Sequence, residues 1–329
     1  MLRLKCFFGQ ILTFLFVLLI CCKPLSAQEL YLLGGALGDI ESSNRSYSWA
    51  LEYLQGLGEY TAFSISWLNE GHLPNNHRDG VAAQFWARTK KIDNQFVLAA
   101  GAGPYYFYDT LLAERGRGFN DTHGVGGIFS LAGLWYTESP WVIQLRSNVI
   151  KTNSIDTWSA IVGVGYQLDY LRARSLSSQS EVNKKTTDNE ISILIGQTTI
   201  NSSNSQQSVA EEIEYRRGIT RYLDWTVALV NEGDNRLDNR SGILSEIWAV
   251  RDFANDRLAL GIGLGPYFLI DRNRSATQTQ DVYAIAGVLS LSASYRFNPN
   301  WLARLSWNRV ATNYNRDADV IMIGPGYRF

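Results

Sequence analysis

Short stretches in which apolar and polar residues alternate recur along most of the chain. In residues 61–68, Phe63, Ile65 and Trp67 share one face, and the positions between them are small or polar. Such alternation is typical of β-strands with two different faces. The segments are about 9–11 residues long, the length of a tilted membrane-crossing strand. The pattern predicts strands near residues 29–36, 45–54, 60–69, 80–90, 95–109, 124–138, 141–150, 158–169, 190–200, 208–217, 222–231, 242–251, 257–271, 282–297, 301–310 and 319–329.

The segment from Trp67 to Trp86 returns in altered form between Trp225 and Trp248. An internal repeat of this kind indicates a duplicated protein. We therefore expect two eight-strand repeats, residues 28–171 and 190–329, joined by a linker at 172–189 that is rich in Ser, Lys, Thr and Asn. The residues that both copies keep, at matching separations, are Asn69-Glu70-Gly71 and Asn231-Glu232-Gly233, Arg78 and Arg240, Gly80 and Gly242, and Trp86 and Trp248.

The two ends of the chain indicate a secreted, membrane-directed protein. Residues 1–27 have the parts of a signal peptide: Arg3 and Lys5, an apolar core at 7–20, and a small-residue cleavage site that ends at Ala27. All three cysteines lie in this segment, so the mature chain needs neither disulfides nor thiolate metal sites. The chain ends on Phe329, with an aromatic residue two positions earlier.

This combination of a signal peptide and a terminal Phe329 resembles the outer-membrane β-barrel proteins of Gram-negative bacteria. The resemblance implies a location in the cell outer membrane and contact with outer-membrane lipid and lipopolysaccharide. It also implies that the barrel assembly machinery recognises Phe329. The alternation by itself would equally suit a soluble β-sandwich, in which the apolar face packs on a second sheet.

The predicted fold is an all-β transmembrane antiparallel barrel. The odd connections, such as residues 69–79 and 110–123, are long and polar, while most of the even ones are tight, as expected for outer loops and periplasmic turns. We favour one sixteen-stranded barrel closed by both repeats. The alternative is two tandem eight-stranded barrels, because Gly163–Leu168 is similar to Gly324–Phe329 and each repeat ends like a closing strand.

Several polar and aromatic residues are expected to point into the lumen. They could form an interior network of ion pairs and hydrogen bonds, or line a pore that sets solute preference. We expect Trp86 to face Ala99, and Trp248 to face Gly261, so that each indole lies flat beside glycines as packing or as a stacking platform for sugars. The lumen candidates are Glu52, Gln84, Trp86, Arg88, Gln144, Arg146, Glu246, Trp248 and Arg304.

The outer loops carry a second group of candidates. His72, His77 and His123 are all the histidines of the chain, and Glu70 and Asp79 lie near the first two. Imidazoles with carboxylates could bind zinc, with His72, His77 and His123 as ligands, or perform acid–base hydrolysis with His72, His77, Asp79 and Glu70. The second repeat keeps the Glu but replaces His72, His77 and Asp79, so the retained part of the motif is structural.

These patterns favour a passive pore for small polar solutes or carbohydrate. The alternatives are a surface enzyme acting on envelope lipid or polysaccharide, and a structural or adhesive barrel with a filled interior. The chain contains no nucleophile elbow, phosphate loop or His-Glu-x-x-His motif, so we expect no cofactor and regard an enzyme as the weaker alternative. The formal net charge of −1 gives no reason to expect a nucleic acid partner.

Overall fold

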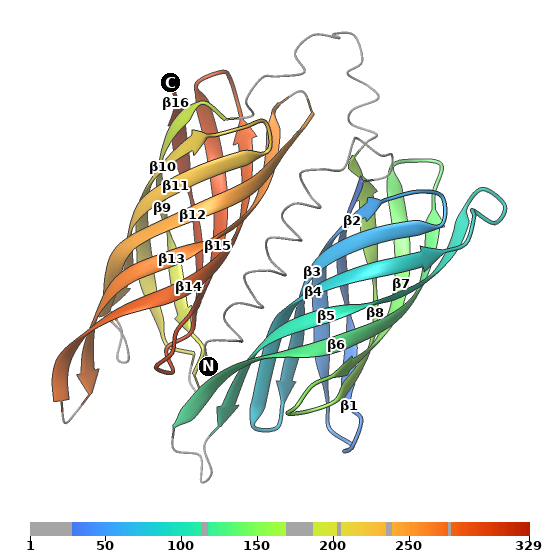
Figure 1. The fold of residues 1–329 in the computed structure, drawn as a ribbon, viewed down its shortest axis with the longest axis horizontal. Coiled ribbons are helices and arrows are strands. Elements are labelled where there is room, and N and C mark those ends of the chain that lie inside the picture. Colours follow the sequence, from blue (N-terminus) through green and yellow to red (C-terminus); the bar gives the residue numbers. More distant parts are fainter. Residues whose placement is uncertain are drawn as a thin grey trace. The chain divides into compact units, whose positions relative to one another are not determined.

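The computed structural model describes residues 28–112, 118–168, 187–202, 205–234, 239–254, 256–275 and 278–329. It is all-β and contains two closed antiparallel barrels (Figure 1). Among the described residues, no helix is long and apolar enough to span a membrane. The predicted signal peptide at 1–27, and all but the last residues of the predicted linker at 172–189, lie outside the described residues.

The first barrel consists of strands β1 to β8. Their bounds are β1 Gln28–Asp39, β2 Arg45–Gly56, β3 Thr61–Leu73, β4 Asn76–Arg88, β5 Phe96–Leu112, β6 Phe119–Tyr136, β7 Trp141–Lys151 and β8 Thr157–Gln167. The second barrel consists of β9 Asn189–Ile200, β10 Gln207–Gly218, β11 Leu223–Asp234, β12 Asn239–Phe253, β13 Leu258–Ser275, β14 Gln278–Arg296, β15 Trp301–Ala311 and β16 Ala318–Arg328. The predicted sixteen strands in two repeats are thus confirmed.

The favoured single barrel of sixteen strands is wrong, and the alternative of two eight-stranded barrels is confirmed. Strand β1 pairs with β8 from Glu29↔Gln167 to Asp39↔Thr157, which closes the first repeat on itself. Strand β9 pairs with β16 in the same way. The first and last strands of each repeat therefore pair with each other and need no strand of the other repeat. Closure removes the exposed edges that a sheet otherwise has.

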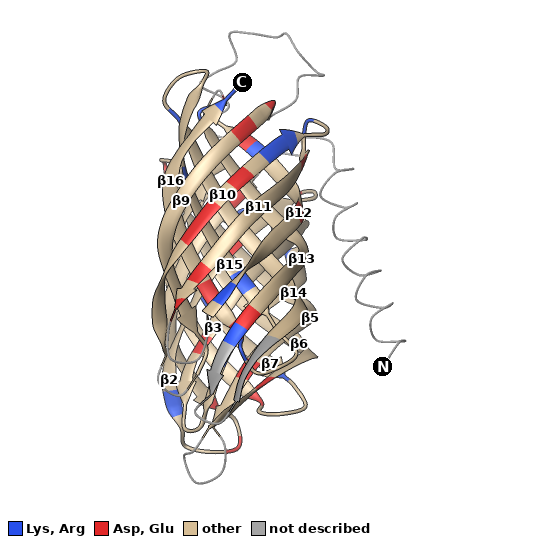
Figure 2. Ribbon diagram, turned by 90° about the vertical axis from the view of Figure 1, so that its left-hand side faces the viewer, with Lys and Arg blue, Asp and Glu red and all other residues tan. Residues whose placement is uncertain are grey.

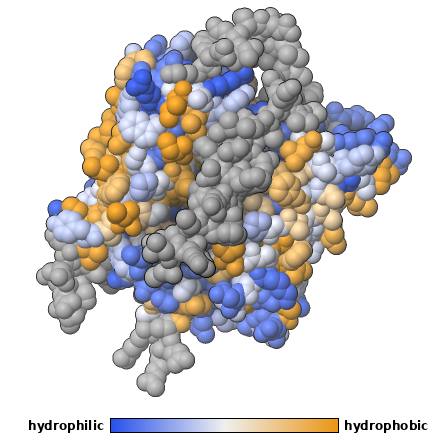
Figure 3. Space-filling model, viewed as in Figure 1, coloured by the Kyte–Doolittle hydropathy of each residue, from blue (hydrophilic) through white to orange (hydrophobic). Residues whose placement is uncertain are grey.

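The apolar face of the wall lies outside and the polar face inside. Strand β7 alternates strictly: Trp141 and Leu145 are more than half exposed, while Gln144 and Arg146 are 1% exposed. Orange, hydrophobic side chains accordingly appear on the outside of the barrels (Figure 3). Outward aromatic pairs mark the short-turn end in both, at Trp141–Tyr166 and Trp301–Tyr327. This arrangement is that of a membrane barrel, because a soluble sandwich buries its apolar face.

The predicted register of the β4–β5 hairpin is wrong by two residues. Trp86 pairs with Gly101 rather than Ala99, and in the second barrel Trp248 pairs with Gly263 rather than Gly261. The tip of the first turn falls on Asp93 and Asn94, both with positive φ. Asp and Asn tolerate this left-handed conformation. The observed turn therefore lies one residue later along the chain than the expected turn at 91–94. Parity is unchanged, so the same side chains point inward.

Separate closure makes a direct prediction for truncation. A chain of residues 28–174 is expected to fold alone in detergent, because its strands need no pairing from the second repeat. The measurement is electrophoretic mobility with and without boiling, since a folded barrel migrates differently from its unfolded chain. A matched chain of residues 187–329 is the control for the second barrel. A fragment whose mobility does not change on heating would contradict separate closure.

Candidate functional site

An ion pair spans the lumen of the first barrel. Arg146 on β7 donates to Glu52 on β2 at 2.5 Å, and both side chains are 0% exposed. Strands β7 and β2 are separated around the wall by β8 and β1, so the pair crosses the interior instead of joining neighbours. Both residues are lumen candidates, and the structure brings them together.

The second barrel carries the same crossing with a different arginine. Arg304 on β15 donates to Glu190 on β9 at 2.6 Å and also to Glu214 on β10. Glu214 occupies the place in the second repeat that Glu52 occupies in the first. Arg304, however, corresponds to Gln144, one inward position away from Arg146. Figure 2 shows acidic positions, in red, along β10 of the second barrel. In both repeats an ion pair thus crosses the lumen between equivalent strands, β7 and β2 in the first barrel and β15 and β10 in the second.

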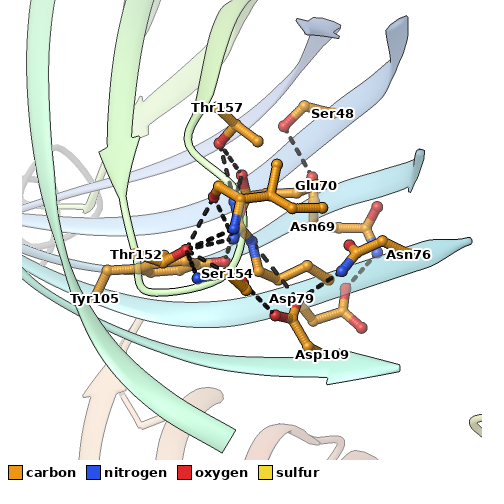
Figure 4. A network of polar contacts seen from close by, with 12 residues as sticks. Ser48, Asn69, Glu70, Asn76, Asp79, Tyr105, Asp109, Thr152, Ser154 and Thr157 are labelled. Carbon is orange, nitrogen blue, oxygen red and sulfur yellow. Dashed lines mark hydrogen bonds and ion pairs between the residues drawn. The ribbon is translucent and has the colours of Figure 1, made fainter. Parts of the chain in front are cut away.

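A second cluster lies at the long-loop end of the first barrel. Arg78 on β4 forms two hydrogen bonds with Glu70 on β3, and Tyr105 donates to the same carboxylate at 2.8 Å (Figure 4). Arg78 also donates to the carbonyl of Ile155 at 2.8 Å, in the loop between β7 and β8. In the second barrel Arg240 binds Glu232 and donates to the carbonyl of Arg316 at 2.8 Å. Each repeat therefore ties the long loop between its last two strands to the hairpin that both repeats share.

The inward tryptophans lie against glycines, Gly101 and Gly263, on the neighbouring strands. A Cβ on Gly101 would lie 2.6 Å from the ring of Trp86, and one on Gly263 would lie 2.5 Å from Trp248. Trp86 is 2% exposed and donates to Ser64 at 2.8 Å, while Trp248 is 1% exposed and donates to Thr226 at 2.9 Å. Both indoles are enclosed by the chain itself.

The remaining lumen candidates lie at different levels. Gln84 is buried and donates to Ser130 at 2.9 Å. Arg88 lies near the short-turn end, where it donates to the carbonyls of Gly58 and Thr61. Gln144 and Glu246 are buried inside their barrels.

The four candidates for catalysis are divided between two faces of the wall. Strand β3 continues to Leu73, and strand β4 already begins at Asn76. Both strands therefore extend into residues 69–79, which the sequence suggested was a loop. Strand parity then turns Glu70 into the lumen, where Arg78 holds it. His77 and Asp79 point outward, with 3.7 Å between Nε2 and Oδ2, and the ring of His72 stacks on His77 at 4.3 Å. Glu70 is therefore separated from the histidines.

The third histidine lies on another strand. His123 on β6 contacts Tyr108, with 5.3 Å between ring centroids. Among the described residues, no group of three or more His, Cys, Asp or Glu side chains is arranged to hold a metal ion.

A small polar pocket lies among the long loops of the first barrel, lined by Asp39, Glu41, Thr152, Asn153, Ser154, Ile155 and Asp156. A hydrogen bond from Lys151 and one from the Thr152 amide lower the pKa of Asp156. Hydrogen bonds from Ser42 and the Glu41 amide lower the pKa of Asp39. Both carboxylates are thus ionised at neutral pH.

Several buried charged residues of the two interiors were not among the candidates predicted from the sequence. Glu190 and Arg216 line the second lumen, and Arg216 lies over the ring of Trp248 at 4.2 Å. In the first barrel, buried Glu29 accepts hydrogen bonds from Tyr31 and Tyr136. Strand parity could have identified all three acidic or basic groups as inward, but their partners depend on strands far apart in sequence.

No protein-family model and no curated protein matches this sequence. Solved structures do match. The N-terminal β-barrel domain of Pseudomonas aeruginosa OprF has 9% identity and a TM-score of 0.35, over 43% of this chain and 98% of that one. The KdgM porin has 8% identity and a TM-score of 0.19, over 92% of this chain and 99% of that one. The outer membrane protein Omp33 of Acinetobacter baumannii has 10% identity and a TM-score of 0.20, over 93% of this chain and 100% of that one.

Proposed function

We propose that this protein is an integral protein of the Gram-negative outer membrane whose two barrels are narrow conduits closed by interior ion pairs. In this proposal they pass water and small ions and exclude sugars. The observation that carries it is the fully buried pair of Arg146 and Glu52 across the first lumen, with Arg304 and Glu214 across the second. An eight-stranded barrel leaves an interior only wide enough for side chains to fill, so carbohydrate has no path.

Buried polar atoms of the ion pair and of the neighbouring Gln144 support an interior that contains water. Within the described residues, Nε and Nη2 of Arg146, Oε1 of Glu52 and Oε1 of Gln144 form no hydrogen bond with protein. Buried polar groups of this kind are usually satisfied by ordered water. Water held between charged groups offers a path for small ions when the ion pair opens.

The outward surface supports membrane insertion through both barrels. Leu145, Ile193 and Leu229 are each about 60% exposed on outward faces, which suits contact with lipid chains. Phe329 is 57% exposed, and its backbone pairs with Asn189 at the end of the closing strand. In the proposed setting this exposed aromatic residue is available to the barrel assembly machinery, and the outer loops contact lipopolysaccharide.

The proposal is tested by conductance across planar bilayers. The wild-type protein is expected to show small, brief openings. The double variant Glu52→Gln and Glu214→Gln is expected to raise conductance severalfold and favour anions, because Arg146 and Arg304 then lose a buried counter-charge.

Glu41→Gln, which changes an exposed carboxylate in an outer loop, is the matched control and should leave conductance unchanged. Liposome swelling measures the size limit. Rapid swelling in sugar solutions would contradict narrow conduits. Silence of both wild type and the double variant would instead support a purely structural barrel.

A further inference from the structure

Three arginines gather at the short-turn end of the second barrel. Arg217 is the next-to-last residue of β10, Arg221 lies in the following turn, and Arg251 is near the end of β12. Two of them flank one ring: the guanidinium carbons of Arg221 and Arg251 lie 5.4 Å and 5.8 Å from the centroid of Tyr222. Arg217 and Arg221 are exposed. Two cations thus flank one aromatic side chain, and Arg217 lies near the end of β10 just before the same turn.

Outward aromatic residues place this arginine cluster at the depth of lipid headgroups. Arg217 pairs with Trp225 on β11, and Trp225 contacts Tyr215 with 6.4 Å between ring centroids. Trp and Tyr on the lipid-facing surface mark the membrane–water interface. Further along the same face, Ile213 and Leu229 are more than half exposed, as expected where acyl chains cover the wall. The arginines therefore lie just beyond the hydrocarbon region.

The first barrel carries a less basic version of the same end. Tyr60 matches Tyr222, and the ammonium of Lys90 lies 5.6 Å from its ring centroid. Here Glu59, at the place of Arg221, forms a salt bridge with Lys90 at 3.2 Å. The positions of Arg217 and Arg251 are held by Gln55 and Thr89. The tyrosine and its cation are thus common to both barrels, whereas the excess of positive charge belongs to the second.

Guanidinium groups match the oxygens of a phosphodiester in geometry as well as charge, since they donate two parallel hydrogen bonds. The nearby carboxylate of Asp252 is engaged by Arg296 at 3.3 Å. We propose that Arg217, Arg221 and Arg251 bind the headgroup of an anionic phospholipid, with its acyl chains along the outward face of β10 and β11. This inference rests on the proposed membrane function and identifies a lipid ligand for one barrel only.

The test measures lipid bound to the full-length protein by native mass spectrometry. Micelles contain phosphatidylglycerol and phosphatidylcholine with identical acyl chains. The wild-type protein is expected to retain phosphatidylglycerol preferentially. Each Arg→Gln change among Arg217, Arg221 and Arg251 is expected to lower that preference about fivefold, which corresponds to about 1 kcal/mol per basic residue near a lipid surface.

The first barrel supplies the matched gain of function. Glu59→Arg should create a second site beside Tyr60 and add a second bound phosphatidylglycerol. Arg45→Gln, which removes an exposed arginine at the opposite end of the first barrel, should change nothing. Millimolar inorganic phosphate should not displace the lipid.

Folding is checked in the same samples by heat-dependent electrophoretic mobility and by insertion into liposomes. A folded, inserted protein without preference for phosphatidylglycerol overturns the lipid site and leaves the proposed function intact. An unchanged preference in the triple Arg→Gln variant, or displacement by free phosphate, also overturns it. Failure to insert into liposomes counts against the proposed membrane function itself.

Discussion

Arg304→Ala is expected to destabilise the second barrel by about 3–5 kcal/mol, the usual cost of removing one partner from a buried ion pair. Arg304 is 2% exposed and is bonded to Glu190, Glu214, Ser192 and Ser294. Its loss leaves two carboxylates in the lumen without their shared cation. Glu214 then keeps only Arg216, at 3.2 Å, and Glu190 keeps only Arg296, at 3.6 Å. The cost comes mainly from leaving each buried carboxylate with one cation instead of two.

The measurement is a urea titration of the protein refolded in lipid vesicles. Residues 28–329 contain no cysteine, so one engineered cysteine carries a fluorophore in a chosen barrel. Asn153→Cys reports on the first barrel and Thr220→Cys on the second. The second barrel should lose stability while the first is unchanged, because each closes on itself. A loss below about 1 kcal/mol, the typical value of a surface pair, would contradict the buried role of Arg304.

Trp248→Ala alone is expected to lower the free energy of unfolding of the second barrel by about 3–5 kcal/mol, the range for truncating a buried aromatic residue. Trp248 is enclosed by Gly263 on one side and the guanidinium of Arg216 on the other, and its Nε1 donates to Thr226. Removal leaves a cavity in a lumen that has little freedom to collapse, since a closed wall holds its diameter.

The pairing of Trp248 with glycine can be tested by a double-mutant cycle. Gly263→Ala should cost about 1–3 kcal/mol in the wild-type background, because the new methyl would overlap the indole. In a Trp248→Leu background the same change should cost far less. The Thr220→Cys fluorophore again reports unfolding. Additive losses would show that the glycine is needed for another reason. Trp86 and Gly101 provide the equivalent cycle in the first barrel.

Much of the lumen could be anticipated from strand parity. Glu52, Gln84, Gln144 and Arg146 all lie inside, as the alternation of polar and apolar positions indicated. Partners could not be anticipated in the same way. Arg146 meets Glu52 because β7 and β2 face each other across a barrel of eight strands, and a barrel of sixteen would have held them apart.

The candidate catalytic group shows how a small error in an element boundary changes a site. The polar stretch at 69–79 suggested a loop, in which Glu70, His77 and Asp79 could converge. The chain instead remains extended there, with a bulge at Gly71, whose φ is +62°. An extended strand sends alternate side chains to opposite faces, so Glu70 and Arg78 enter the lumen while His77 and Asp79 face outward.

By itself the sequence determined the strands, their two faces, the duplication and the residues that point inward. These features depend on local periodicity, which each segment carries without reference to the rest of the chain. Only the tertiary structure decided where each sheet closes, the hairpin register and which inward charges meet. Closure depends on hydrogen bonds between β1 and β8, and between β9 and β16, and the alternation of side chains is the same whichever strand becomes the neighbour.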